Sequence, residues 1–177
     1  MGHVFRYIAL ALVVAVPPAA WAAPAGSPAS IAALKQCDAI DEMAESDRDA
    51  AIERGLTAAE AAVDANAADG RAHFAVVCYL GKRMGRAGIS FRQISDLRHL
   101  RRELDVTLTL APDDADALLA KGALLLRLPR LLGGDPGEAE TLLRRALAFE
   151  PDNTAARCFL AEAERSRGVS VAPPAGC

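Results

Sequence analysis

The 177-residue sequence has few aromatic side chains, which make up 5% of it, although 52% of its residues are hydrophobic. Its core must therefore be built mainly from alanine, leucine and valine. Strands favour aromatic and β-branched residues, so this composition argues against a β-sandwich and favours closely packed helices. The length is sufficient for one domain. We therefore expect a single all-α domain.

The sequence also lacks a large excess of charge of either sign. Its formal net charge of −3 gives no overall attraction to nucleic acid or to an anionic membrane. The strongest positive cluster interleaves four arginines with two carboxylates: Arg92, Arg98, Arg101, Arg102, Glu103 and Asp105. We interpret this cluster as a solvated helix face and expect no nucleic-acid partner.

Residue types that carry catalysis or bind metals are scarce. We interpret His73 and His99 as lone groups without a catalytic partner. No Cys-x-x-Cys pair is present, which argues against a zinc knuckle or a thiol oxidoreductase. The glycine-rich segment 133–137 lacks the lysine and hydroxyl residue of a phosphate loop. The aspartates at 113–116 lack calcium-loop spacing and suit helix capping better. We expect no catalytic residue, metal or cofactor.

No apolar run is long enough to cross a membrane. The longest, Ile8–Val16, falls well short of the roughly 20 residues that a span needs. Together with Arg6 before it, and two prolines and Ala20-Trp21-Ala22 after it, this run resembles a secretory signal peptide. We predict a signal peptide over residues 1–22, export to the periplasm and no membrane span in the mature chain. An uncleaved anchor is the alternative.

Four cysteines follow the predicted cleavage site: Cys37, Cys78, Cys158 and Cys177. An even number in an oxidising compartment indicates disulfides. Of the three pairings we favour Cys37–Cys78, which would join neighbouring helices, and Cys158–Cys177, which would tie down the tail. The alternative is that Cys78 and Cys158 are small buried residues with free thiols.

Apolar residues at spacings of three and four predict a helical domain over residues 30–167. A flexible leader (23–29) would precede it and an irregular tail (168–177) would follow. The seven predicted helices cover about 30–45, 48–66, 71–84, 91–110, 115–128, 136–150 and 154–167. Ser46-Asp47 should cap the second helix, and Asp135 with Pro136 should start the sixth. Gly55 should weaken the second helix, because an interior glycine costs up to about 1 kcal/mol.

A turn sequence recurs along the chain. Residues 68–70, 112–114 and 151–153 occupy corresponding positions, 44 and 39 residues apart. Superposing them aligns Cys78, Gly122 and Ala161, which are small residues in the middle of a helix. A small residue there lets two helices approach closely. Such periodicity is typical of a stacked helical solenoid.

The chain resembles tetratricopeptide repeat (TPR) proteins over about residues 30–167. The best match is Glu138–Gly168, and the matching small and large positions are Gly122, Ala139, Leu143, Ala146, Pro151 and Ala161. The units are longer than the 34 residues of that repeat, with the additions at 85–90 and 129–135. The resemblance implies a helical-hairpin solenoid that binds a protein or peptide without catalysis. The loop Leu132–Asp135 also resembles the T-components of TRAP transporters, which implies an alternative role as an accessory subunit of a periplasmic transport system.

In TPR proteins the first helices of successive units line a concave groove, so the resemblance implies a bound peptide or partner helix. The residues predicted to face this groove are Tyr79, Lys82, Arg83, Arg86, Arg127, Arg130, Glu162 and Arg165. Because most are basic, we expect an acidic peptide or protein face as partner. The alternative is that they are ordinary surface charges. An odd number of helices also leaves an unpaired end, which the tail or a homo-oligomer contact would cover.

Overall fold

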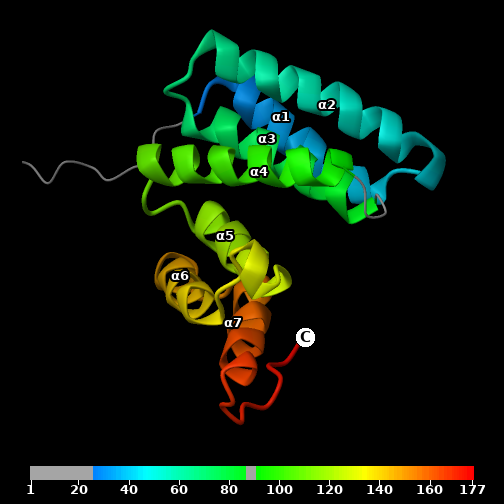
Figure 1. Ribbon diagram of the computed structural model, residues 1–177. Coiled ribbons are helices and arrows are strands. Elements are labelled where there is room, and N and C mark those ends of the chain that lie inside the picture. Colours follow the sequence, from blue (N-terminus) through cyan, green and yellow to red (C-terminus); the bar gives the residue numbers. More distant parts are fainter. Residues whose placement is uncertain (1–25, 87–90) are drawn as a thin grey trace, which may run out of the picture.

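The computed structural model describes residues 26–86 and 91–177, which form seven α-helices and no strand (Figure 1). The helices are α1 (Pro28–Ala39), α2 (Glu45–Ala65), α3 (Gly70–Arg86), α4 (Phe91–Leu110), α5 (Ala115–Arg127), α6 (Pro136–Phe149) and α7 (Thr154–Ser166). Two short 3₁₀ turns, η1 (Ile40–Glu42) and η2 (Arg130–Leu132), follow α1 and α5. The predicted all-α class is confirmed. The predicted signal peptide lies outside the described residues, and so does most of the predicted loop at 85–90.

Polar side chains fix where most of these helices begin. Ser27, Asp114, Asp135 and Asn153 each accept a hydrogen bond from a backbone N–H in the first turn of α1, α5, α6 and α7. Asp69 does the same for α3. These bonds satisfy donors that a helix start leaves without an intrahelical partner. The sequence predicted the starts of α5, α6 and α7, but not the caps at Ser27 and Asp69.

The segment between α1 and α2 differs from the prediction. α1 ends at Ala39 rather than near residue 45, because the chain turns through η1. The side chain of Arg48 holds this turn by donating to the carbonyl oxygens of Asp41 and Met43. The predicted cap of α2 is wrong: α2 begins at Glu45 after Ala44, without a side-chain cap, so residues 46–47 lie within its first turn.

The helices pack in adjacent pairs and form two blocks (Figure 1). The N-terminal block, α1–α4, has a core whose largest buried side chains are Ile40, Ile52, Tyr79, Leu80 and Leu104. The C-terminal block, α5–α7, has its own core, which includes Leu118, Leu125, Leu142 and Leu143. Leu108 of α4 packs against both cores. The molecule is therefore one continuous body with two centres of packing.

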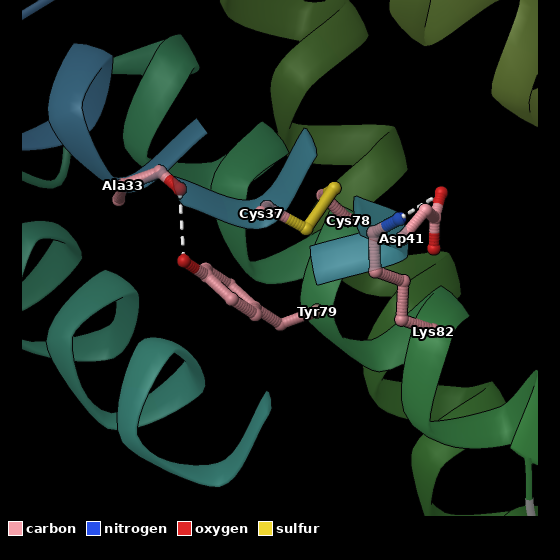
Figure 2. The surroundings of a disulfide bond; sticks show 6 residues. All are labelled: Ala33, Cys37, Asp41, Cys78, Tyr79 and Lys82. Atoms are coloured by element: carbon pink, nitrogen blue, oxygen red, sulfur yellow. Dashed lines mark hydrogen bonds and ion pairs between the residues drawn. A yellow bond between two sulfur atoms is a disulfide. The ribbon is translucent and has the colours of Figure 1, made fainter. Parts of the chain in front are cut away.

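A disulfide joins α1 to α3 in the N-terminal block. Cys37 and Cys78 are bonded, and Cys37 is fully buried. Figure 2 shows Tyr79 beside this bond, with its hydroxyl donating to the Ala33 carbonyl oxygen at 2.9 Å. Burial, with a smaller contribution from the charge of Asp38, raises the pKa of Tyr79, so the hydroxyl keeps its proton. The predicted pairing of Cys37 with Cys78 is confirmed.

Gly55 has a packing role that the sequence did not reveal. A Cβ atom at this position would lie 2.1 Å from Cε1 of Tyr79. The ring of Tyr79 therefore occupies the space next to the backbone of α2. The local cost of a glycine inside a helix is thus offset by close packing between α2 and α3.

In the C-terminal block, Gly122 is the predicted point of close approach. A Cβ atom there would lie 2.7 Å from Cγ of Leu143, so α5 and α6 pack closely at this pair. The second predicted disulfide, Cys158–Cys177, is also confirmed. It returns the irregular tail to α7, and Gly176 lies next to Thr154 at the start of that helix.

The two blocks meet less extensively than a regular stack would predict. α1 packs on α3 and α5 packs on α7, as first helices of successive units do, whereas α3 and α5 have no comparable contact within the described residues. Ion pairs supplement the contact between blocks: Arg71 lies 3.8 Å from Asp114, and Lys121 lies 2.9 Å from Asp105. Among the helices of the described residues, none is long and apolar enough to cross a membrane.

Candidate functional site

The basic residues of α3 that were predicted to line a groove are paired with carboxylates of the protein itself. Lys82 Nζ lies 2.7 Å from Asp41 Oδ2, the pair shown in Figure 2. Arg86 contacts Glu45 and Asp49 of α2 at 2.7 and 2.6 Å. The carboxylates of these pairs are largely exposed, and exposed pairs contribute only about 0.2–1 kcal/mol each. An acidic partner could replace them at small cost.

Arg83 is held much more firmly. It forms two hydrogen bonds with Asp96 of α4, at 2.9 and 2.7 Å, and a third with Glu53 at 3.2 Å. Burial acts to lower the pKa of Arg83, but the bonds to Asp96 and Glu53 outweigh it and raise that pKa. The side chain of Asp96 is only 9% exposed, so removing Arg83 would leave a buried charge unpaired, at a cost of about 3–5 kcal/mol. Arg83 is therefore a structural residue that joins α3 to α4.

Tyr79 lies inside the core rather than on a groove surface. It is 1% exposed, and its hydroxyl already has a partner in α1. Tyr79 therefore does not present its hydroxyl to a partner. Of the predicted groove residues on α3, only Lys82 and Arg86 are thus accessible to a partner.

The remaining predicted residues belong to the C-terminal block or to its loop. Arg127 is exposed at the end of α5, and its guanidinium lies 5.4 Å from the ring centre of Phe159 in α7. This cation–π contact keeps the charge at the surface. Arg130 is exposed in η2. Glu162 and Arg165 are exposed on α7, where Arg165 Nε donates to the carbonyl oxygen of Ala161.

The loop that connects α5 to α6, residues 129–135, has a defined conformation. Gly133 and Gly134 donate backbone hydrogen bonds to Arg130 and Pro129, and the N–H of Asp135 donates to the Leu125 carbonyl oxygen. Gly133 has a φ of +85°, which favours glycine. A Cβ atom on Gly134 would lie 1.8 Å from the Leu128 carbonyl oxygen, so the chain fits there only without a side chain.

This loop presents two leucines to solvent. Leu131 is 99% exposed and Leu132 is 53% exposed. From α4, Arg101 Nη1 donates to the Leu132 carbonyl oxygen at 2.9 Å, which ties the loop to the N-terminal block. The exposed arginines 127 and 130 precede the leucines in the chain. Apolar side chains displayed on a fixed loop that also carries basic groups are typical of a contact surface rather than of a core.

An open cleft adjoins this loop. It is lined by Arg130, Gly134, Asp135, Pro136, Gly137, Ser166 and Arg167, and its volume is about 800 Å³. The carboxylate of Asp135 accepts from the N–H groups of Glu138 and Gly137, which lowers its pKa. Arg167 binds Glu140, a buried carboxylate that also receives Arg144. The polar groups of this cleft are therefore used to start α6 and to hold α6 against α7.

The histidines are not isolated, contrary to the sequence interpretation. Nδ1 of His73 lies 2.6 Å from Glu103, and Nε2 lies 3.0 Å from the Ala67 carbonyl oxygen. His99 lies 3.3 Å from the same Glu103. The relation of His99 to Glu103, four residues apart on one helix, was visible in the sequence. The position of His73 required the packing of α3 on α4. The buried ring of His73 links these helices to the turn after α2.

The aspartates at 113–116 serve as cap and ion-pair groups. Asp114 accepts from the N–H of Ala117, and Arg71 lies near Asp114 and Asp116. Burial, followed by the charges of Asp114 and Glu150, raises the pKa of Asp116. The capping interpretation is confirmed. No group of three or more candidate metal ligands occurs in the described part of the chain.

No protein-family model matches the chain, and none of the curated proteins matches it. Its function must therefore be argued from its own residues.

Proposed function

We propose that the protein is a non-catalytic binding module, built as a TPR-like stack of helical hairpins, whose partner is a protein that docks on the C-terminal block. The observation that supports this most directly is the exposure of Leu131 and Leu132 on a loop of fixed conformation. A surface that is exposed to water favours polar residues at the tip of such a loop. The presence of two leucines there is best explained by a partner that covers them.

The distribution of ion pairs directs the partner to this end of the molecule. Arg83 is unavailable, and Lys82 and Arg86 already have carboxylate partners. Arg127 and Arg130 are exposed, and Arg130 directly precedes the two leucines in the chain. The proposed acidic partner therefore contacts the α5–α6 loop and its surroundings, with a smaller contribution from α3 than the sequence implied.

Export of the protein to the periplasm is part of this proposal. Two disulfides include all four cysteines. Disulfides form and persist mainly in oxidising compartments, so their presence supports a location outside the cytoplasm. The partner would then be another exported protein.

The alternative is an accessory subunit of a periplasmic transport system. It is supported by the resemblance of Leu132–Asp135 to TRAP T-components, and the same loop carries the exposed leucines. Under this alternative the partner is a substrate-binding protein, which the identity of the captured protein would reveal.

The experiment is affinity capture from periplasmic extract with the tagged full chain and two matched charge-reversal variants. Arg127→Glu with Arg130→Glu should reduce capture of the partner at least tenfold, because charges in a contact surface determine encounter and fit. Lys82→Glu with Arg86→Glu reverses two charges on α3 and should reduce capture no more than about twofold. Capture that depends only on the α3 pair, or no protein captured above a tagged unrelated bait, would refute the proposal.

A further inference from the structure

The shape of the α5–α6 loop specifies the shape of its partner. Leu131 is 99% exposed, so essentially no side chain of the protein surrounds it. Such a residue cannot form the floor of a groove. It can be buried only if the partner supplies the concave surface. An extended peptide has no cavity that could enclose a leucine side chain.

We propose that Leu131, supported by Leu132, inserts into an apolar pocket of a folded protein partner and that carboxylates surround this pocket. The inference rests on the proposed function, since it names the kind of protein that the binding module takes. Leu131 would be the central anchor, because a partner that encloses it removes its whole apolar side chain from water. The half-exposed Leu132 would lie at the edge of the contact.

Charge complementarity supports the acidic rim. Arg127 and Arg130 lie on either side of Pro129 and are exposed. The guanidinium of Arg127 is positioned over Phe159, so it is presented in a defined place. The charge of Arg130 acts on Asp135, the carboxylate of this loop, but the hydrogen bonds that Asp135 accepts come from two N–H groups at the start of α6. The positive charge beside the leucines is thus available to a partner's carboxylates.

The rigidity of the loop supports a preformed contact. Backbone hydrogen bonds to Leu125, Pro129 and Arg130 fix its course, and Arg101 binds the Leu132 carbonyl oxygen. A loop that is already in its bound conformation loses little conformational entropy on binding. This is the expected design for insertion of a single anchor into a pocket.

The test uses the full chain with a photo-crosslinking amino acid at position 131, and the same amino acid at Phe149 as the control. Phe149 is 50% exposed in the same block, at the far end of α6, about 20 Å along the helix from the loop. We expect position 131 to crosslink to one exported protein and position 149 to give none of that product. Crosslinking of both positions to the same protein in equal yield would overturn the proposal.

Substitution of Leu131, with Phe149 as the control, is the second part of the test. Leu131→Asp should weaken binding of the crosslinked protein at least about tenfold, whereas Phe149→Asp should change it less than twofold. Because Leu131 contacts almost nothing, circular dichroism and the melting temperature should match the wild type. If the wild-type chain captures a protein and Leu131→Asp captures it equally well, the pocket inference is wrong, and the proposed function stands only if Arg127→Glu with Arg130→Glu still reduces capture. If no protein is captured, the proposed function itself fails.

Two other occupants would also overturn the inference. A crosslink from position 131 to a second copy of this chain would assign the loop to self-association. Sedimentation with vesicles that contain anionic phosphatidylglycerol, abolished by Leu131→Asp, would assign it to a membrane surface. The overall negative charge of the chain makes attraction to such vesicles the weaker expectation.

Gly134→Ala tests the fixed loop separately. Its Cβ atom would meet the Leu128 carbonyl oxygen, so the loop must shift while Leu131 stays in the sequence. We expect binding to weaken several-fold with far-ultraviolet circular dichroism unchanged. Unchanged affinity would show that the loop conformation is not needed and would contradict a preformed anchor.

Discussion

The N-terminal and C-terminal blocks differ in what holds their helices together. In the N-terminal block a disulfide and the buried ring of Tyr79 join α1 to α3, and the Arg83–Asp96 pair joins α3 to α4. In the C-terminal block the helices pack through small residues such as Gly122, and the disulfide ties down only the tail. The more heavily crosslinked block is not the one that displays the exposed loop.

We infer from this difference that the N-terminal block stabilises the fold and that the C-terminal block provides the contact surface for a partner. The predicted basic groove residues of the N-terminal block are paired with carboxylates within the block, as for Arg86, which is bound by Glu45 and Asp49. The C-terminal block leaves Leu131 and its neighbouring arginines to solvent. We therefore expect mutations in the first block to affect stability, and mutations in the α5–α6 loop to affect binding.

Removal of the disulfides should show the largest difference between the blocks. Cys37→Ala with Cys78→Ala opens a loop of 41 residues and should lower the free energy of unfolding by about 4 kcal/mol. Hydrogen exchange should then increase throughout α1 and α3. Denaturant unfolding of the non-reduced variants measures the effect.

The corresponding change in the C-terminal block is the control. Cys158→Ala with Cys177→Ala opens a loop of 19 residues, for which the same relation gives at most about 3 kcal/mol. Faster exchange should be confined to residues 168–177 and the adjoining part of α7. Loss of protection in α1–α4 from this variant would contradict the separation of the blocks.

Substitution of glycines should give the next largest effect. Gly55→Ala places a methyl group on the ring of Tyr79 and should cost about 3 kcal/mol through overpacking. Gly81→Ala in α3 is the matched control, because a Cβ there meets nothing within 4 Å. It should raise stability by up to about 1 kcal/mol, since alanine favours a helix. Thermal unfolding distinguishes these opposite signs, and equal effects would refute the packing role of Gly55.

Substitution of the two capping aspartates, Asp69 and Asp135, should give the smallest difference in stability. Burial acts to raise the pKa of Asp69, but hydrogen bonds from Ser27, Ser30 and Ala72 outweigh it, and the pKa lies below 3.8. Asp69 is 6% exposed and joins the starts of α1 and α3. Asp69→Asn should therefore cost about 1–2 kcal/mol near neutral pH.

The dependence on pH follows from the sign of this shift. A lowered pKa means that the ionised Asp69 stabilises the fold fully above pH 3.8, and that this contribution disappears as the pH falls through the lower, folded-state pKa. The wild type and Asp69→Asn should thus converge in stability below about pH 4. Asp135→Asn, at an exposed cap, should show a smaller loss in the same window. Acid titration of the melting temperature measures both.

Most helix positions could be predicted from the sequence because their signals are local, and the disulfide pairing followed from which helices were expected to be neighbours. Asp135-Pro136 identifies the start of α6, and the small residue Gly122 identifies a helix contact. The burial of Tyr79 and the pairing of Arg83 could not be predicted in this way. Both depend on residues of other helices, Gly55 and Asp96, whose approach is determined by tertiary packing.

The candidate site was predicted only in part for the same reason. Basic residues on α3 fit the pattern of a groove, but a sequence pattern does not show which charges the fold already neutralises. The loop at 129–135 was identified because it departs from the repeat. The exposure of Leu131 became evident only from the structure, since a leucine beside another leucine more often indicates a core.

The α5–α6 loop also has a consequence for how such a protein could change over time. Its course is set by backbone hydrogen bonds and by the two glycines at 133 and 134, whereas the side chains at 131 and 132 contribute little to the fold. Substitutions at these two positions can therefore alter the choice of partner without a compensating change elsewhere. A lineage could acquire a new specificity by single mutations here while inheriting the same helical framework.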